Sequence, residues 1–243
     1  MKKTLSLLLL VVGQMVLAQD EKITHPSATS RRYHEYRQAI SEPAHHLAKI
    51  KTISKKIKAD KEGNTRLADK DYEALTFEEK FTFNMIHGED SSQNCDAMMG
   101  IMSEERKIFK YIPDAFGDEI TWSVRQREFL KSNRDKVIPL IRATMNLRQR
   151  VGANLKDAIM EVNGIELIPD LIATYKLKRK DHDVLTLLML LMKEGDFSEF
   201  KASASYTKLF GENANYKSFL DASPANQKLI MERAMTYYKS KTK

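Results

Sequence analysis

The chain has little cysteine, little valine and, beyond its first residues, no long apolar run. One cysteine in 243 residues, Cys95, excludes an intramolecular disulfide framework and any cysteine-only metal site. No segment after the N-terminus approaches 18 consecutive apolar residues, so the sequence predicts no membrane span there. Strand signals are scarce, because residues 19–243 contain only five valines. With 42% hydrophobic residues, however, the chain is too apolar to be disordered, and we predict an all-α globular fold.

The N-terminus has the three parts of a secretory signal. Lys2 and Lys3 precede a short apolar run from Leu5 to Leu17, and the small Ala18 follows. The run is short for an uncleaved membrane anchor. We therefore predict a signal peptide over residues 1–18, cleavage near Ala18, and a periplasmic or extracellular location in a bacterium. The polar residues 19–30 are expected to form a flexible leader.

Helix signals occupy the remainder, which we interpret as one helical domain over residues 31–243. Basic N-terminal helices are predicted over 31–59, and the main helical core over 75–243. Three N-terminal signatures support helix starts: the capping boxes Thr76 to Glu79 and Ser123 to Gln126, and the pair Ser223-Pro224.

One short motif recurs at a period of 30 residues. Residues 137–145 (VIPLIRATM) and 167–175 (LIPDLIATY) align without gaps, and each is predicted to place a proline, Pro139 or Pro169, in the first turn of a helix. A second apolar helix follows after Asp181. Residues 135–193 thereby resemble HEAT-like α-helical repeats, which implies stacked α-hairpins and a binding scaffold rather than an enzyme. An ordinary helical bundle with two similar hairpins is an equally open interpretation.

The formal net charge of +7 is distributed in blocks. Residues 31–58 carry eight basic and two acidic side chains, residues 59–120 seven basic and fifteen acidic, and residues 121–156 nine basic and two acidic. The acidic block is expected to pair with the basic blocks inside the chain or to remain solvated. An external anionic surface is the alternative partner for the basic blocks, and secretion argues against nucleic acid as that partner.

The best candidate contact surface is a basic helix over residues 43–58. Leu47, Ile50, Ile53 and Ile57 fall on one helical face. Lysines occupy other positions, and these are the candidate binding residues: Lys49, Lys51, Lys55, Lys56 and Lys58. Such a helix binds a partner or a membrane surface, or packs its apolar stripe on its own core.

Signals for catalysis or cofactors are weak. Glu42 and His46 have helical i, i+4 spacing, but His34 lies twelve residues before His46, and no His-Glu-x-x-His motif exists. We predict no metal site and keep these three residues as weak candidates. His87 with Cys95 lacks any orienting third group, and Asp181-His182-Asp183 sits where a helix cap and first-turn acid belong. No phosphate-binding loop or dinucleotide fingerprint is present, so no cofactor is predicted.

The sequence favours an envelope-associated interaction or scaffold protein over an enzyme. The expected partner is another envelope protein or an anionic envelope surface. Two alternatives remain open. One is a hydrolase acting on envelope material, in which His34, Glu42, His46 and His87 would converge. The other is a carrier of small apolar ligands. The aromatic residues of segment 200–219 are expected to contribute to the core rather than to line a ligand groove.

Overall fold

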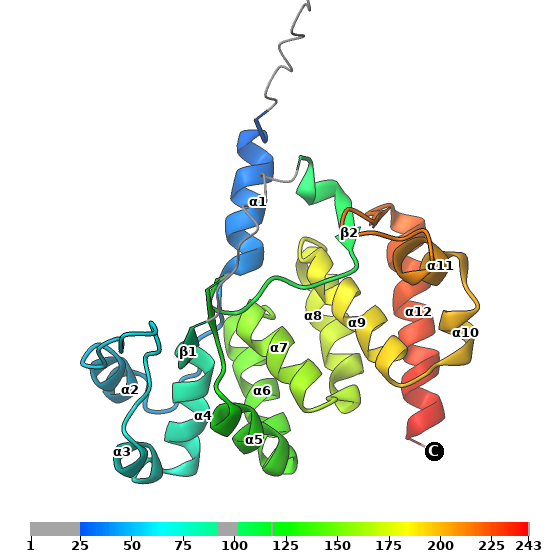
Figure 1. Cartoon of the computed structure of the whole chain (residues 1–243). Coiled ribbons are helices and arrows are strands. Elements are labelled where there is room, and N and C mark those ends of the chain that lie inside the picture. The colour runs from blue at the N-terminus through cyan, green and yellow to red at the C-terminus, as the bar shows by residue number, and fades with distance from the viewer. Residues whose placement is uncertain (1–24, 92–101, 118, 243) are drawn as a thin grey trace, which may run out of the picture.

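The computed structural model describes residues 25–91, 102–117 and 119–242. This part contains twelve α-helices, two 3-10 helices and four short strands (Figure 1). The α-helices are α1 (Ala28–Gln38), α2 (Leu47–Ser54), α3 (Asp69–Glu73), α4 (Phe77–Ile86), α5 (Val124–Ser132), α6 (Arg134–Arg148), α7 (Ala153–Glu161), α8 (Ile168–Lys178), α9 (His182–Glu194), α10 (Ser198–Lys201), α11 (Ala204–Phe210) and α12 (Pro224–Lys241). The other elements are η1 (Glu104–Arg106), η2 (Ile165–Leu167), β1 (Asp90–Ser91), β2 (Lys107–Phe109), β3 (Ile120–Thr121) and β4 (Phe219–Asp221). The all-α prediction is confirmed.

Two consecutive helix pairs, α6 with α7 and α8 with α9, form the centre of the molecule (Figure 1). Equivalent helices of the two pairs touch, because α6 packs on α8 and α7 packs on α9. A polar contact joins α6 and α8, because Arg142 Nε of α6 lies 2.9 Å from Asp170 Oδ2 of α8. The predicted position of Pro139 is wrong: α6 begins at Arg134, so Pro139 lies inside the helix, whereas Pro169 does lie in the first turn of α8.

Helix α9 is the most deeply packed element, and α12 covers it. Its apolar residues from Val184 to Met192, with the exception of the half-buried Leu190, are fully buried in the main hydrophobic core. The fit against α12 is tight at Gly195, the residue that caps α9. A Cβ atom there would lie 1.7 Å from the hydroxyl oxygen of Tyr237 in α12, so a side chain would force the two helices apart.

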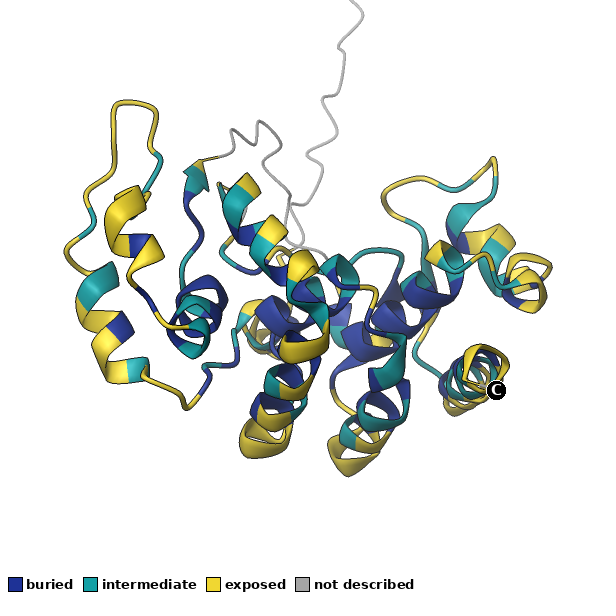
Figure 2. Cartoon of the chain, turned by 90° about the horizontal axis from the view of Figure 1, so that it is seen from below, coloured by how far each residue is buried: buried dark blue, intermediate teal, exposed yellow. Residues whose placement is uncertain are grey.

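A second, smaller core lies at the other end of the molecule, where α2, α3 and α4 meet. It is built on Ile50, Tyr72, Leu75 and Phe83. The rings of Tyr72 and Phe83 meet edge to face, with 5.9 Å between their centroids. Of α2 itself only Ile50 is buried, and this end of the molecule is largely exposed (Figure 2).

Two antiparallel ladders join segments that are distant in the sequence. Strand β1 pairs with β3, and β2 pairs with β4. The second ladder ties the segment before the helix pairs to the one that leads into α12. Both ladders are short, which agrees with the scarcity of valine.

Helix α1 docks through one face, on which Ser30, Tyr33 and Arg37 are buried. These positions lie three and four residues apart and therefore share a side of the helix. The helix begins within the range predicted as a flexible leader, because Ser27 Oγ accepts a hydrogen bond from the Ser30 amide and caps Ala28. The leader prediction is thus wrong for residues 28–30.

The basic helix predicted over 43–58 is also too long. Helix α2 starts only at Leu47, after His46 takes a left-handed conformation with φ of 54°, and it ends at Ser54. Both capping boxes and the proline start of α12 are confirmed. Among the described helices none combines the length and the apolar character needed to cross a bilayer. The predicted signal peptide over 1–18 and Cys95 lie outside the described residues.

Candidate functional site

A groove of about 520 Å³ lies between α2 and the segment that leads into and along α3. Its floor is apolar and includes Ile53, Ile57, Leu67 and Leu75. Four basic side chains stand around this floor, Lys49, Lys56, Lys58 and Arg66, with Asp71 as the acidic member of the lining. The volume falls in the range of about 300–1,000 Å³ that is usual for binding pockets.

The groove follows from how α2 sits on the small core. Ile50 is fully buried, whereas Ile53 and Ile57 pack on the edge of the cluster and remain partly exposed. Helix α2 is only eight residues long, and past its end the chain turns away. The turn after the helix therefore carries Lys56, Ile57 and Lys58. It lies beside Leu67 and Leu75, which complete the floor of the groove.

The five candidate lysines divide into two groups. Lys49 Nζ lies 2.7 Å from Glu79 Oε1, and Lys51 Nζ lies 2.6 Å from Glu42 Oε1. Lys55, Lys56 and Lys58 are exposed and have no ion-pair partner within the described ranges. Two of these three line the groove, so the unneutralised charge gathers at its open side.

The weak metal candidates are not brought together. His34 Nδ1 is 3.0 Å from Glu104 Oε1, and His46 Nδ1 is 3.6 Å from Glu79 Oε1, while Glu42 pairs with Lys51. His87, named for the hydrolase alternative, places Nε2 at 2.6 Å from the carbonyl oxygen of Thr65. Within the described residues no three histidine, cysteine or acidic side chains form a group that would hold a metal ion.

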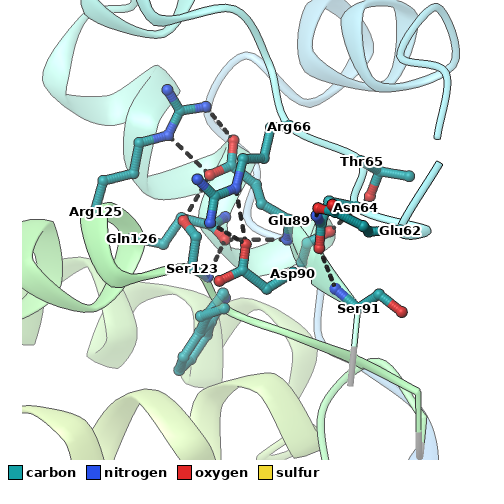
Figure 3. Close-up of polar contacts among 12 residues, drawn as sticks. Glu62, Asn64, Thr65, Arg66, Glu89, Asp90, Ser91, Ser123, Arg125 and Gln126 are labelled. Carbon is teal, nitrogen blue, oxygen red and sulfur yellow. Dashed lines mark hydrogen bonds and ion pairs between the residues drawn. The ribbon is translucent and has the colours of Figure 1, made fainter. Parts of the chain in front are cut away.

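A polar network holds the groove wall against α5 (Figure 3). At its centre is Glu89, which is fully buried and accepts hydrogen bonds from Ser123 Oγ at 2.6 Å and from Arg125 Nε at 2.8 Å. Glu89 also accepts from the Leu67 amide at 3.2 Å, and Arg125 reaches Asp69 Oδ1 at 2.7 Å. Arg125 Nη2 also donates to the Leu67 carbonyl oxygen at 2.5 Å, so the backbone of Leu67, which lines the groove, is held on both sides.

Hydrogen bonding decides the charge state of Glu89. Burial pushes the pKa of this carboxyl upward, but the bonds from Arg125 and Ser123 outweigh that effect and hold the pKa below its usual value. Nearby, Arg66 Nη2 lies 2.6 Å from Asp90 Oδ1, and the Ser91 amide donates to Asn64 Oδ1 at 2.9 Å (Figure 3). The cation of Arg66 at the groove is therefore partly neutralised.

A second network lies in the interior and involves the Asp181-His182-Asp183 segment. Arg37 of α1 donates from Nε and Nη2 to Asp183, each at 2.9 Å, and from Nη1 to Glu104 Oε2 at 3.2 Å. Lys156 Nζ donates to Asp181 Oδ1 at 2.8 Å. Arg37, Glu104, Asp183 and Lys156 are each at most 3% exposed. Asp181 is the N-cap residue of α9 and Asp183 lies in its first turn, as predicted, but the Asp181 side chain makes no cap bond.

Sequence reasoning missed both networks. Their members pair across long stretches of chain, for example 146 residues between Arg37 and Asp183. Periodicity reveals nothing about such pairs. The one available signal was the charge blocks: Glu79, Glu89 and Glu104 come from the acidic block and pair with cations of the two basic blocks.

The aromatic segment 200–219 contributes to the core in part. Phe200 is fully buried, and Tyr206 and Phe210 pack against it with ring centroids 5.5 and 6.4 Å away. Tyr216 is exposed. Comparison of the chain with protein-family models, curated proteins and solved structures gave no match.

Proposed function

We propose that this protein is an envelope-associated interaction protein, acting in the periplasm or outside the cell, and that it binds a partner protein through the groove beside α2. The observation that carries the proposal is the combination of an apolar floor with the unpaired Lys56 and Lys58 at its rim. The occupant we infer is a segment of the partner that carries apolar side chains flanked by aspartate or glutamate.

Both halves of the groove support this occupant. A partner that covers the partly exposed isoleucines stabilises the complex, by about 25 cal/mol for each Å² of apolar surface removed from water. The lysines supply charge complementarity, which raises the association rate and disfavours basic partners. A purely anionic polymer or membrane surface would use the lysines but leave the floor of Ile53, Ile57 and Leu67 without a role.

The wall network supports a preformed site. Glu89 accepts from the Leu67 amide and Arg125 donates to the Leu67 carbonyl oxygen, so this part of the wall is ordered before a partner arrives. A rigid groove loses less conformational entropy on binding than a mobile one, which favours affinity.

The test is selection of 12-residue peptides from a displayed random library on residues 19–243, followed by affinity measurement on synthetic copies. We expect enriched peptides to combine Asp or Glu with Leu, Ile or Phe, and to bind Lys56→Glu/Lys58→Glu at least about tenfold more weakly. Ile57→Gln tests the floor and is expected to weaken binding as well.

The matched control is Lys217→Glu/Lys228→Glu, which makes the same charge change on exposed residues of the C-terminal part. It should leave peptide binding unchanged, and both double variants should keep the free energy of unfolding within about 0.5 kcal/mol. Equal binding to native protein and the Lys56/Lys58 variant, or no enriched peptide, would contradict the proposal. Binding to phosphatidylglycerol vesicles that is insensitive to Ile57→Gln would indicate a membrane surface instead.

A further inference from the structure

A second hollow, of about 470 Å³, lies where α1, η1 and the turn between α8 and α9 meet. Four of its lining side chains are cations: Arg32, Lys178, Arg179 and Lys180. Glu105 is the acidic side chain of the lining, and Tyr33, His182 and Thr29 complete it. This site is far from the groove in sequence and shares no lining residue with it.

The cations of this hollow are not neutralised by the chain. In the described part of the protein, Arg32, Lys178, Arg179 and Lys180 take part in no ion pair. Lys180 Nζ lies over the ring of Tyr36, 4.6 Å from its centroid. The hollow therefore has an excess of three positive charges from its ionised side chains, counting Glu105, and that charge favours an anionic ligand.

Local structure explains why these cations converge. Arg179 takes a left-handed conformation with φ of 47° and ends α8, which lets the chain reverse within three residues before α9 begins. The His182 amide donates to Tyr33 Oη at 3.1 Å, which holds the start of α9 against α1. The buried Arg37–Asp183 pair fixes the same two helices beneath the hollow.

Two hydrogen-bond acceptors of the lining have no hydrogen-bond partner among the residues that the structure describes. His182 is only 7% exposed, and its Nδ1 atom is buried with no hydrogen bond. Glu105 Oε2 is likewise buried without a hydrogen bond. Burial lowers the pKa of His182, which favours the neutral ring and leaves it able to accept. Buried acceptors left unmatched are costly, so a ligand that supplies donors would be stabilised here.

We propose that this hollow binds a phosphorylated sugar or polyol. Its phosphate would lie among Arg32, Lys178 and Arg179, because guanidinium and ammonium groups form charge-assisted hydrogen bonds with phosphate oxygens. Its hydroxyl groups would donate to Glu105 and His182. The same chemistry is offered by a free sugar phosphate and by the headgroup of a glycolipid or phosphatidylinositol.

Calorimetric titration of residues 19–243 with glucose 1-phosphate, inorganic phosphate and glucose tests the proposal. We expect glucose 1-phosphate to bind more tightly than either fragment. Lys178→Gln/Arg179→Asn should weaken its binding about tenfold or more, because charge-assisted hydrogen bonds are lost. Asparagine at position 179 tolerates the left-handed backbone, so the turn is preserved.

Lys176→Gln is the matched control, since Lys176 is an exposed lysine of the same helix that does not line the hollow. It should leave the affinity unchanged. Glu105→Gln distinguishes contacts to the sugar from contacts to the phosphate. It should weaken the binding of glucose 1-phosphate, whereas inorganic phosphate should bind as tightly as before or more tightly. Co-sedimentation with phosphatidylinositol vesicles distinguishes a headgroup, which pellets the protein, from a free sugar phosphate, which does not.

Absence of saturable binding by glucose 1-phosphate together with absence of vesicle binding would overturn the proposal. Equal affinity of native protein and Lys178→Gln/Arg179→Asn would overturn it too. If inorganic phosphate binds as tightly as glucose 1-phosphate, the hydroxyl contacts to Glu105 and His182 are wrong.

Discussion

Two ion networks join distant segments of the chain, Arg37 of α1 to Asp183 of α9 and Glu89 to Arg125 of α5, and they differ in depth. The Arg37 network is closed, because cation and carboxylates are all at most 3% exposed. The Arg125 network has a buried carboxylate, Glu89, but the Arg125 side chain is 23% exposed and its second partner, Asp69, is 98% exposed. The first network sets how α1 lies on α9, whereas the second borders a groove and is open to solvent.

The difference indicates what each network contributes. A buried pair gains little net stability over apolar side chains of similar size, but removing one partner leaves a charge with neither water nor a counterion. The closed network therefore makes docking of α1 specific and intolerant of substitution. In the open network, water solvates a charge that has lost its partner. Substitutions there should therefore lower the free energy of unfolding by less.

The largest effect is expected from breaking the closed network with Arg37→Met. Asp183 then loses its guanidinium partner, for which Lys156 at 3.8 Å is only a distant replacement, whereas Glu104 keeps its contact with His34 Nδ1 at 3.0 Å. The free energy of unfolding should fall by about 3–5 kcal/mol, measured by urea denaturation. Arg31→Met, at an exposed position of the same helix, is the control and should cost under about 0.5 kcal/mol. A similar small loss for both variants would contradict the proposed difference in depth.

Glu89→Gln should have a smaller effect, about 2–3 kcal/mol, since Arg125 keeps access to water and to Asp69. The cost should depend on pH. The folded-state pKa of Glu89 is depressed, so its contribution is present above the unfolded pKa and is lost as pH falls through the folded value. Urea denaturation at pH 7 and at pH 3 should therefore show the gap between native protein and variant shrinking at low pH. A gap that is constant with pH would assign the effect to packing rather than charge.

A carboxylate of α7, Asp157, sharpens the comparison, because it is half-buried and has no ion pair with another described residue. Asp157 Oδ2 accepts only the Ala115 amide, at 3.0 Å, among the described hydrogen bonds. Burial, followed by the nearby charge of Asp114, raises the pKa of Asp157 to about 7. The folded state thus holds a proton that the unfolded state releases at lower pH, and stability should decline as pH rises from about 4 to 7.

Asp157→Asn should remove that decline. The amide oxygen still accepts from Ala115, so the variant should be more stable than the native protein at pH 8, on the order of 2 kcal/mol, and about equal at pH 4. Thermal denaturation across this range measures the difference. Unchanged pH dependence in the variant would show that Asp157 ionises normally and that the contrast between paired and unpaired carboxylates does not hold.

Local features of the fold were predictable where one turn of chain decides them. The capping boxes at Thr76 and Ser123 depend on residues three apart, and the start of α12 depends on the adjacent pair Ser223-Pro224. The structure confirms all three. Helix lengths were less predictable. The lysine-rich segment continues to Lys58 as a helical pattern, but α2 stops at Ser54 because only Ile50 finds a deep position in the small core.

For the two candidate sites, the sequence indicated which types of residue are abundant but not which residues lie together. Ile53, Ile57, Lys49, Lys56 and Lys58 of the predicted contact segment do line the groove, but no pattern in the sequence related them to its other wall at Leu67 and Leu75. The hollow at the turn after α8 was missed because Arg32 and Arg179 are joined only by the docking of α1. That docking depends on Arg37 and Asp183, which no spacing rule relates.

The position of α12 has a consequence for how the chain is made. Helix α9 is complete when residue 194 is synthesised, but the helix that covers its apolar side begins only at Pro224. Until then the leucines and methionines of α9 lack part of their covering. During synthesis a nascent chain would expose that surface, so we expect chains cut before residue 224 to be prone to aggregate.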